Sequence, residues 1–483
     1  MTRRLIMLAL AALASASSLR AQRAPVYVPE TDPLVLEKLE QWQDLKLGLL
    51  MHWGTYSQWG IVESWSLCSE DEPWCKRSMP DYSAYKKAYE ALQTTFNPVK
   101  FDPERWAKAA KDAGMKYVVF TTKHHDGFSM FDTKQTDYKI TSPKTPFSSN
   151  PRADVTRAIF DAFRAQGFMI GAYFSKPDWH SPDYWWPYFA TPDRNPNYDI
   201  KKYPDRWQRF VAFTQAQIDE LMANYGRVDI LWLDGGWVRV RTDAEIRDEM
   251  NRPDYKFMHY QSQPIDMPRI VANARAKQPG LIVVDRDVPG PYQDYLTPEA
   301  RVPEKALPYP WEVPMPMANS WSYVPNDSYK SPRTLIHMLA DVVAKGGNLL
   351  LNIGPGPDGT WHDAAYDRLA ALGAWMKVNS EAIYGTRAIA PYADGKVRLT
   401  RGKDGSVYAI YLADSAETDL PRYLTLGNVV PTPSATVTLL GTGRALSWEK
   451  SGTGFVARIP SGLHAPSKFA WVFKISQVLP AER

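Results

Sequence analysis

The feature that most constrains this fold is a regular alternation of apolar runs and helix-like segments between residues 45 and 385. The strand-like runs are residues 45–54, 116–125, 168–175, 228–236, 281–287 and 348–355, with 311–321 as a further candidate. The helix-like segments are residues 103–113, 154–166, 207–225, 268–277, 331–345 and 364–379. Runs such as KYVVFTT are apolar on both faces, which is typical of parallel strands covered by helices. The alternation predicts an α/β fold, a TIM-like (β/α) barrel that need not be regular.

The pattern changes from about residue 388. Short stretches of alternating polar and apolar residues, such as SVYAIYLA and FAWVFKIS, are separated there by Gly, Asp, Ser and Pro. This is typical of antiparallel strands joined by turns. We therefore expect the (β/α) barrel over residues 22–387 and a C-terminal antiparallel β-sandwich over 388–483, the latter serving as a structural brace.

The first 21 residues have the composition of a signal peptide. Arg3 and Arg4 precede an apolar run over residues 5–14, and small residues follow. No later apolar run is long enough to span a membrane. We expect an exported chain, periplasmic or secreted, with no membrane association after cleavage. Cys68 and Cys75 are its two cysteines, and whether they pair stays open.

Charge and aromatic content narrow the class of ligand. The 57 basic and 53 acidic residues give a net charge of +4 with no basic block, so nucleic-acid binding is not indicated. The 18 tryptophans exceed what a core readily fills, and an indole face suits flat amphipathic ligands such as sugars. The candidate pocket walls are Trp53, Trp65, Trp179, Trp232, Trp237, Trp311 and Trp321.

Polar and aromatic residues follow five of the predicted strands. The strand ends read MHWG, KHHDG, YFS, LWLDGGW and DRD, and carry His52, His124, His125, Tyr173, Asp234 and Arg286. Active sites of TIM barrels are built from such residues. The histidines lack the spacing of a zinc motif, and His124 and His125 would face opposite sides of a strand. We expect neither a metal nor a cofactor.

The remaining chemistry is that of carboxylates. Asp234 ends an apolar strand and shares its face with Trp232, two residues earlier. Glu299, Glu304 and Glu312 follow in a proline-rich stretch. A fixed Asp and a separate Glu among aromatic and hydroxyl-binding groups are what glycoside hydrolysis requires.

Six segments, in order, resemble the α-L-fucosidases of glycoside hydrolase family 29. They are MHWGTYSQWG, KYVVFTTKHHDGF, LWLDGGW, VVDRD, PWE followed by SWSY, and GGNLLLNIGPGPDG, and the resemblance covers roughly residues 30–385. It implies a retaining exo-α-L-fucosidase that forms a covalent fucosyl-enzyme on a TIM-like barrel, without metal or cofactor. The implied partner is a fucosylated oligosaccharide or polysaccharide.

The resemblance also implies roles for individual residues. Asp234 matches the nucleophile, and Glu299 is favoured over Glu312 as acid/base, with Glu304 a distant third. The implied sugar-binding residues are His52, Glu63, Trp65, His124, His125, Tyr173, Trp232 and Arg286. Ser64 separates Glu63 from Trp65 where the family has an adjacent pair, which leaves open which of the two reaches the sugar.

Two other functions fit the same residues. One is a glycosidase of the same fold acting on a related sugar, such as an α-galactoside, whose C4 hydroxyl is axial like that of fucose. The other is a catalytically inactive carbohydrate-binding protein, which the presence of Asp234 and several Glu candidates disfavours.

Overall fold

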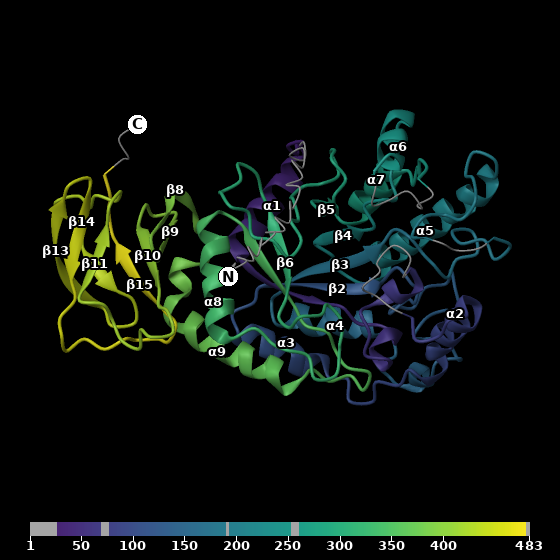
Figure 1. Cartoon of the computed structure of the whole chain (residues 1–483), viewed down its shortest axis with the longest axis horizontal. Coiled ribbons are helices and arrows are strands. Elements are labelled where there is room, and N and C mark those ends of the chain that lie inside the picture. Colours follow the sequence, from purple (N-terminus) through teal and green to yellow (C-terminus); the bar gives the residue numbers. More distant parts are fainter. Residues whose placement is uncertain (1–26, 69–76, 190–192, 253–259, 480–483) are drawn as a thin grey trace, which may run out of the picture.

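The computed structural model describes residues 27–68, 77–189, 193–252 and 260–479. The expected signal peptide and Cys75 lie outside these ranges. Seven parallel strands form one curled sheet in the order β5-β4-β3-β2-β1-β7-β6 (Figure 1). They are β1 (Leu47–Met51), β2 (Tyr117–Lys123), β3 (Met169–Ser175), β4 (Ile230–Asp234), β5 (Ile282–Asp285), β6 (Glu312–Pro316) and β7 (Asn348–Asn352). Each lies within a segment that the sequence pattern predicted, and the TIM-like fold is confirmed.

A non-strand segment fills the gap between the two edge strands, β5 and β6. We call residues 292–300 the closing segment. Gln293 forms an antiparallel bridge with Val284 of β5, and Leu296 forms a parallel bridge with Trp311, just before β6. The chain thus runs back along β5 and then turns to run beside β6. The barrel is closed by backbone hydrogen bonds at this point, but not by a regular eighth strand.

Helices lie between the strands in the chain, and most of them cover the outside of this sheet. Within the described ranges they are α1 (Pro33–Leu45), α2 (Tyr82–Ala91), α3 (Pro103–Asp112), α4 (Val155–Ala165), α5 (Pro204–Asn224), α6 (Asp243–Met250), α7 (Met267–Lys277), α8 (Pro332–Ala344) and α9 (Asp363–Asn379). All six predicted helices are present, whereas α1, α2 and α6 were not predicted. Side chains of Asp102, Asp154 and Ser331 accept hydrogen bonds from the first turns of α3, α4 and α8, as N-caps do.

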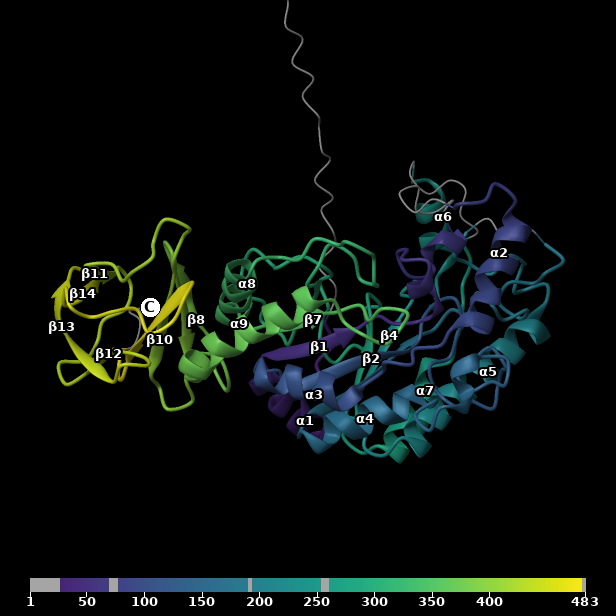
Figure 2. The same ribbon diagram turned by 90° about the horizontal axis from the view of Figure 1, so that it is seen from below.

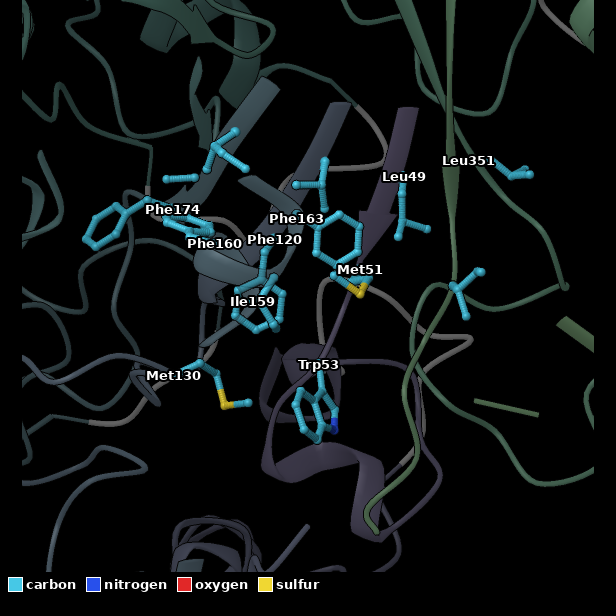
Figure 3. Packing of buried hydrophobic residues seen from close by; sticks show 14 of the residues in the cluster. Leu49, Met51, Trp53, Phe120, Met130, Ile159, Phe160, Phe163, Phe174 and Leu351 are labelled. Carbon is cyan, nitrogen blue, oxygen red and sulfur yellow. The ribbon is translucent and has the colours of Figure 1, made fainter. Parts of the chain in front are cut away.

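Successive side chains of each strand point alternately to the core under the helices and to the interior of the barrel. Figure 3 shows Ile159, Phe160 and Phe163 of α4 near Phe120 of β2 and Phe174 of β3, all of them buried. Burying each such aromatic side chain contributes roughly 1.5–3 kcal/mol. The intervening strand positions, including Tyr117, Tyr173 and Trp232, form a second buried cluster inside the barrel. Because their neighbours are anchored in the outer core, these inward side chains have fixed positions.

The C-terminal region is an antiparallel sheet in the order β11-β14-β13-β12-β15-β10-β9-β8. Its strands are β8 (Arg387–Asp394), β9 (Val397–Arg401), β10 (Val407–Leu412), β11 (Tyr423–Leu426), β12 (Val437–Leu439), β13 (Arg444–Ser451), β14 (Gly454–Arg458) and β15 (Ala470–Ile475). Leu446 of β13 pairs with β12, whereas Trp448 pairs with β14. The sheet can therefore fold over at β13 and enclose its own core, which confirms the predicted β-sandwich.

The sandwich packs on α8 and α9, which lie between it and the parallel sheet in Figures 1 and 2. Arg398 of β9 forms an ion pair with Asp341 of α8 at 2.5 Å. Trp375 of α9 donates a hydrogen bond to the carbonyl of Ala470 at 2.9 Å, and Ile410 of β10 is buried in the same core as the barrel helices. This contact is apolar as well as polar. None of the helices in the described ranges is long and apolar enough to cross a membrane.

Candidate active site

A cavity of about 530 Å³ opens at the carboxyl ends of the parallel strands. His52 follows β1, His124 follows β2, Tyr173 lies on β3, Asp234 ends β4 and Arg286 follows β5. The cavity also has walls from Glu63, Trp65, Trp232 and Glu299. Of the eleven residues to which the sequence assigned roles, nine line the cavity, and His125 and Glu312 lie behind its surface.

Asp234 is the most strongly held carboxylate in the cavity. Its Oδ2 accepts a hydrogen bond from the Tyr173 hydroxyl at 2.6 Å, and its Oδ1 accepts from Arg286 at 3.1 Å and from the backbone N–H of Gly235 at 2.7 Å. Burial opposes ionisation, yet the pKa of Asp234 lies well below its usual range, chiefly because of the Arg286 charge. Asp234 is therefore an ionised, oriented carboxylate with 14% of its side chain exposed to the cavity.

Two glycines let the chain turn sharply after Asp234. Gly235 has a φ of +87°, and a Cβ there would lie 2.3 Å from Cδ of Pro177. A Cβ on Gly236 would lie 2.8 Å from the carbonyl oxygen of Arg286. Any other residue type would push apart the loops after β3, β4 and β5, and so the LDGG sequence sets the position of Asp234 relative to Arg286.

Three neutral histidines surround the carboxylate. Burial lowers the pKa of His52 to about 4 and that of His125 to about 3, and it lowers the pKa of His124 well below the usual value. Nδ1 of His52 lies 2.9 Å from Oδ1 of Asn352, so it donates, and Nε2 remains available as an acceptor. Neutral imidazoles can bind sugar hydroxyls without compensating the charge of Asp234.

The expectation that His124 and His125 face opposite sides is wrong. Their ring centroids are only 4.2 Å apart, and Nε2 of His125 lies 3.8 Å from Oδ2 of Asp234. Strand β2 ends at Lys123, so strand alternation does not extend to the two histidines. Ligand atoms of His124, His125 and Asp234 come within 4.8 Å of one another, a spacing that a metal ion could use. The guanidinium of Arg286, which bonds to the same Asp234, would repel a cation there.

Both Glu63 and Trp65 line the cavity, and the intervening Ser64 faces His124. Oγ of Ser64 lies 2.5 Å from Nδ1 of His124. Oε1 of Glu63 accepts a hydrogen bond from the backbone N–H of Ser322 at 2.9 Å, and burial raises the pKa of Glu63 to about 8. The inserted serine thus does not remove either neighbour from the site. It ties the short 3-10 helix that follows Glu63 (Ser64–Cys68) to His124, just after β2.

Arg286 connects the two ends of the site. One terminal nitrogen donates to Asp234 and the other to Oε2 of Glu299. Glu299 belongs to the closing segment, and 44% of its side chain is exposed. Two carboxylates therefore face the same guanidinium, a fixed one on β4 and an accessible one opposite it.

Glu312 lies deeper. It is fully buried at the start of β6, and Oε2 accepts a hydrogen bond from the Tyr117 hydroxyl at 2.6 Å. Oε1 accepts from Nε1 of Trp232 at 3.2 Å and from the Tyr295 hydroxyl at 3.3 Å. Glu304, the third candidate, is exposed and does not line the cavity.

Four of the seven tryptophans expected as pocket walls line the cavity: Trp65, Trp232, Trp237 and Trp321. The expectation is wrong for Trp53, Trp179 and Trp311, which are buried in the outer core. The indole of Trp53, for example, donates to the carbonyl of Gly356 at 3.0 Å and packs against Trp106. A position beside a strand end does not by itself decide which way the ring points.

The outer cavity contains residues that the sequence did not identify. They are Arg194, Asn195, Arg239, Arg241, Glu249, Arg252, Tyr260 and Asp287. The guanidinium of Arg194 lies 4.8 Å from the ring centre of Trp65 and 5.2 Å from that of Trp237. Most of these residues come from long connections after β3 and β4, where neither spacing nor motif marks a residue as cavity-lining.

Sequence comparison decides the family. A profile described as "Alpha-L-fucosidase" matches residues 13–381, and a second, described as "Alpha-L-fucosidase C-terminal domain", matches residues 392–476. The chain belongs to the α-L-fucosidase family. As a member, it is a glycoside hydrolase, and the resemblance to glycoside hydrolase family 29 is confirmed.

Known α-L-fucosidases are similar over nearly the whole chain. Tissue α-L-fucosidase of Bos taurus is 28% identical over 489 residues, which cover 94% of this chain and 92% of the relative. The structure of α-L-fucosidase isoenzyme 1 from Paenibacillus thiaminolyticus superimposes with a TM-score of 0.72 at 28% identity, covering 92% of this chain and all of that one. Thermotoga maritima α-fucosidase in complex with fucose gives 0.69 at 27% identity, covering 93% and 100%.

Proposed function

We propose that this α-L-fucosidase removes terminal α-L-fucosyl residues by double displacement, with Asp234 as nucleophile and Glu299 as acid/base. The observation that carries the proposal is the arrangement of two carboxylates around one guanidinium. Asp234 is ionised and oriented with only 14% of its side chain exposed, whereas Glu299 is accessible on the opposite side of Arg286. Retaining glycosidases need two such groups about 5–5.5 Å apart, close enough for the nucleophile to reach the sugar directly.

In the first step, an oxygen of Asp234 attacks the anomeric carbon while Glu299 gives a proton to the departing glycosidic oxygen. The C–O bond to the leaving group breaks as the fucosyl-Asp234 ester forms. In the second step, ionised Glu299 takes a proton from water, which attacks the same carbon and releases Asp234. An ion pair with Arg286 favours ionised Glu299, the form needed in the second step. For the first step, Glu299 must leave Arg286 and take up a proton.

Glu299 is preferred to Glu312 because of access. Glu312 is fully buried, and its carboxylate is occupied by one indole and two tyrosine hydroxyls. A general acid must come within hydrogen-bond reach of the leaving oxygen, about 2.6–3.2 Å. Glu299 can meet this requirement from the cavity wall.

The rest of the cavity suits a 6-deoxy sugar. Neutral His52 and His124 line the cavity and offer donors and acceptors to hydroxyl groups, and neutral His125 packs directly behind them. Trp232 and Trp321 offer apolar surface to a methyl group, in keeping with the amphipathic character of indole rings. We propose that the reaction uses neither metal nor cofactor, because the Arg286 charge already balances Asp234.

The natural substrate is proposed to be a fucosylated oligosaccharide or polysaccharide met outside the cytoplasm. Residues 1–21 are proposed to act as a signal peptide for export to the periplasm or beyond, with the barrel domain over 22–387 and the sandwich over 388–483. The family match and the charged N-terminal apolar run support this assignment.

The nucleophile is tested by Asp234→Gly. Turnover of 4-nitrophenyl α-L-fucoside should fall to background, because no ester can form, and sodium azide should restore part of it by attacking from the vacated side to give the inverted fucosyl azide. Asp137→Gly, which removes a 77% exposed carboxylate on the surface, is the matched control and should keep full activity. Undiminished turnover by Asp234→Gly would reject the assignment.

The acid/base is tested by Glu299→Ala. Loss of general acid catalysis typically costs 10²- to 10⁴-fold, roughly, and it falls hardest on poor leaving groups. We expect hydrolysis of fucosyl oligosaccharides to drop in that range, while the formation step with aryl fucosides changes far less. Glu304→Ala, in the same loop but outside the cavity, should behave like the unmodified enzyme. Equal losses on both substrate types would contradict the role.

Parallel assays with 4-nitrophenyl α-L-fucoside and 4-nitrophenyl α-L-galactoside, which differ only at C6, separate the proposed activity from its alternatives. Preference for the fucoside is expected, because C6 of a galactoside carries a hydroxyl where the cavity offers indole surface. Faster hydrolysis of the galactoside would favour the related glycosidase, and binding of fucose without turnover of either substrate would indicate an inactive carbohydrate-binding protein.

A further inference from the structure

A carboxylate inside the barrel supports the floor of the cavity. Glu312 has no exposed surface, and its two oxygens accept three hydrogen bonds, all from neutral donors. These donors come from three segments: Tyr117 on β2, Trp232 on β4 and Tyr295 in the closing segment. A single carboxylate has enough lone pairs for all three, whereas an apolar residue would take this shared acceptor away from three buried polar hydrogens.

Trp232 is the member of this group that reaches the cavity. One face of its ring stacks on Tyr173, with centroids 5.1 Å apart and planes inclined by 21°. The guanidinium of Arg286 lies 5.3 Å from the ring centre of Trp232. Among the described residues, Tyr173 and Arg286 are the two side chains that donate hydrogen bonds to Asp234. The indole therefore packs against both groups that orient the proposed nucleophile.

Glu312 restrains this indole by accepting its hydrogen bond. Trp232 is 2% exposed, and its Nε1–H points to Oε1 of Glu312 at 3.2 Å, away from the cavity. Burial raises the pKa of Glu312 to about 7, but either protonation state offers an acceptor to the indole. Rotation of the ring would break this bond and strand a buried N–H, which typically costs about 1–3 kcal/mol.

We propose that Glu312 is a positioning residue for hydrolysis. Glu312 fixes the indole of Trp232, and this indole supports Tyr173 and Arg286. Those two side chains in turn hold Asp234 in the attacking orientation. This inference rests on the proposed role of Asp234 as nucleophile. It assigns Glu312 no proton transfer to substrate, and it predicts that its acceptor oxygens matter, rather than its acidity.

The test compares Glu312→Gln, Glu312→Leu and Trp232→Phe, each alone, and the Leu and Phe changes together. In Glu312→Gln, the amide oxygen can accept from Trp232 and Tyr295 while the amide nitrogen donates to Tyr117, so kcat and KM should stay within about threefold. Glu312→Leu should lower kcat/KM roughly tenfold or more, by the same factor for aryl fucosides and natural oligosaccharides.

The double variant isolates the contact. Trp232→Phe keeps an aromatic ring but lacks the N–H, so adding Glu312→Leu to it should reduce kcat/KM by less than about threefold further. Thermal unfolding of each variant shows whether the chain is folded. If Glu312→Leu does not fold, Glu312→Gln and Trp232→Phe decide, and Trp232→Phe should lower kcat/KM equally for both substrate types.

Two results would overturn the proposal. The first is a loss of more than about 100-fold on oligosaccharides in Glu312→Gln with aryl fucosides spared, which is the behaviour of a general acid. The second is unchanged kcat/KM in Trp232→Phe and in folded Glu312→Leu. Failure of the proposed function is seen separately, as full turnover by Asp234→Gly.

Discussion

Tyr173 joins the candidate nucleophile to the neighbouring strand through a single hydroxyl group. That hydroxyl donates to Oδ2 of Asp234 at 2.6 Å. Hydrogen bonds to a charged group typically contribute about 1.5–3 kcal/mol. We expect Tyr173→Phe to lower kcat/KM for 4-nitrophenyl α-L-fucoside by roughly 10- to 150-fold, with the fold intact.

Tyr138→Phe is the matched control, since Tyr138 is also buried but does not line the cavity, and it should keep its kcat/KM. Steady-state kinetics on both purified variants, with thermal unfolding to confirm folding, decide the matter. Equal activity in the two variants would show that the Tyr173 hydroxyl is not needed to orient Asp234.

The sequence identifies cavity residues at the ends of strands better than cavity residues in loops. His52, Asp234 and Arg286 were identifiable because each directly follows or ends an apolar run, and the ends of parallel strands share one edge. Arg194 and Tyr260 reach the same cavity from irregular connections, so only the folded chain shows their proximity. The direction of a ring such as Trp53 likewise depends on packing between distant segments.

Among the elements, β3 and β5 are joined across β4 by a buried ion pair. Lys176 follows β3 and bonds to Asp285, the last residue of β5, and neither side chain is more than 3% exposed. The backbone N–H of Lys176 also donates to the carbonyl of Asp234 at 3.0 Å. The pair thus fixes the strand end that carries the nucleophile.

Asp285→Asn should lower the free energy of unfolding by about 3–5 kcal/mol, because it leaves the Lys176 charge buried and uncompensated. Adding Lys176→Met removes that charge, and so the double variant should recover part of the loss. Chemical or thermal unfolding of the three proteins measures this. A double variant no more stable than Asp285→Asn would contradict the explanation.

The predictability of elements follows from how much apolar surface each buries. The parallel strands are buried along their length and appear in the sequence as continuous apolar runs. Helix α6 buries no residue, so no hydrophobic periodicity reveals it, although Thr242 and Glu245 form a capping box at its start. Helix α1 does bury Val35, Leu39 and Trp42 at helical spacing, a readable signal that the sequence prediction did not use.

For the whole molecule, buried titratable groups set the pH dependence of stability. Burial raises the pKa of Asp126 to about 6, of Glu312 and Asp294 to about 7, and of Glu63 to about 8. The folded state therefore keeps protons that the unfolded chain loses near pH 4 to 4.5. Their stabilising effect is complete below that range and is lost as the pH rises through the folded pKa values.

The buried histidines act in the opposite direction. The pKa of His52 is about 4 in the fold against 6.5 normally, so the unfolded chain gains protons first, and stability falls as the pH drops from about 6.5 towards 4. We expect the melting temperature to be highest in mildly acidic buffer and to fall between about pH 6 and pH 8. Glu312→Gln should fall less steeply there. A melting temperature that rises over this interval in the unmodified enzyme would contradict the prediction.

Because of the closing segment, the position of the proposed acid Glu299 does not depend on the length of the loop that follows it. Ala300, in a left-handed conformation with a φ of 49°, donates its N–H to the carbonyl of Pro314 on β6 at 3.0 Å. The connection over residues 301–310 thus begins directly after Ala300, which is bonded to β6, and it ends just before the start of the same strand. Insertions and deletions within it can change the length of this loop without shifting Glu299 or opening the barrel. Sequences of this fold can therefore differ in the length of this loop while the arrangement around Arg286 is left as it is.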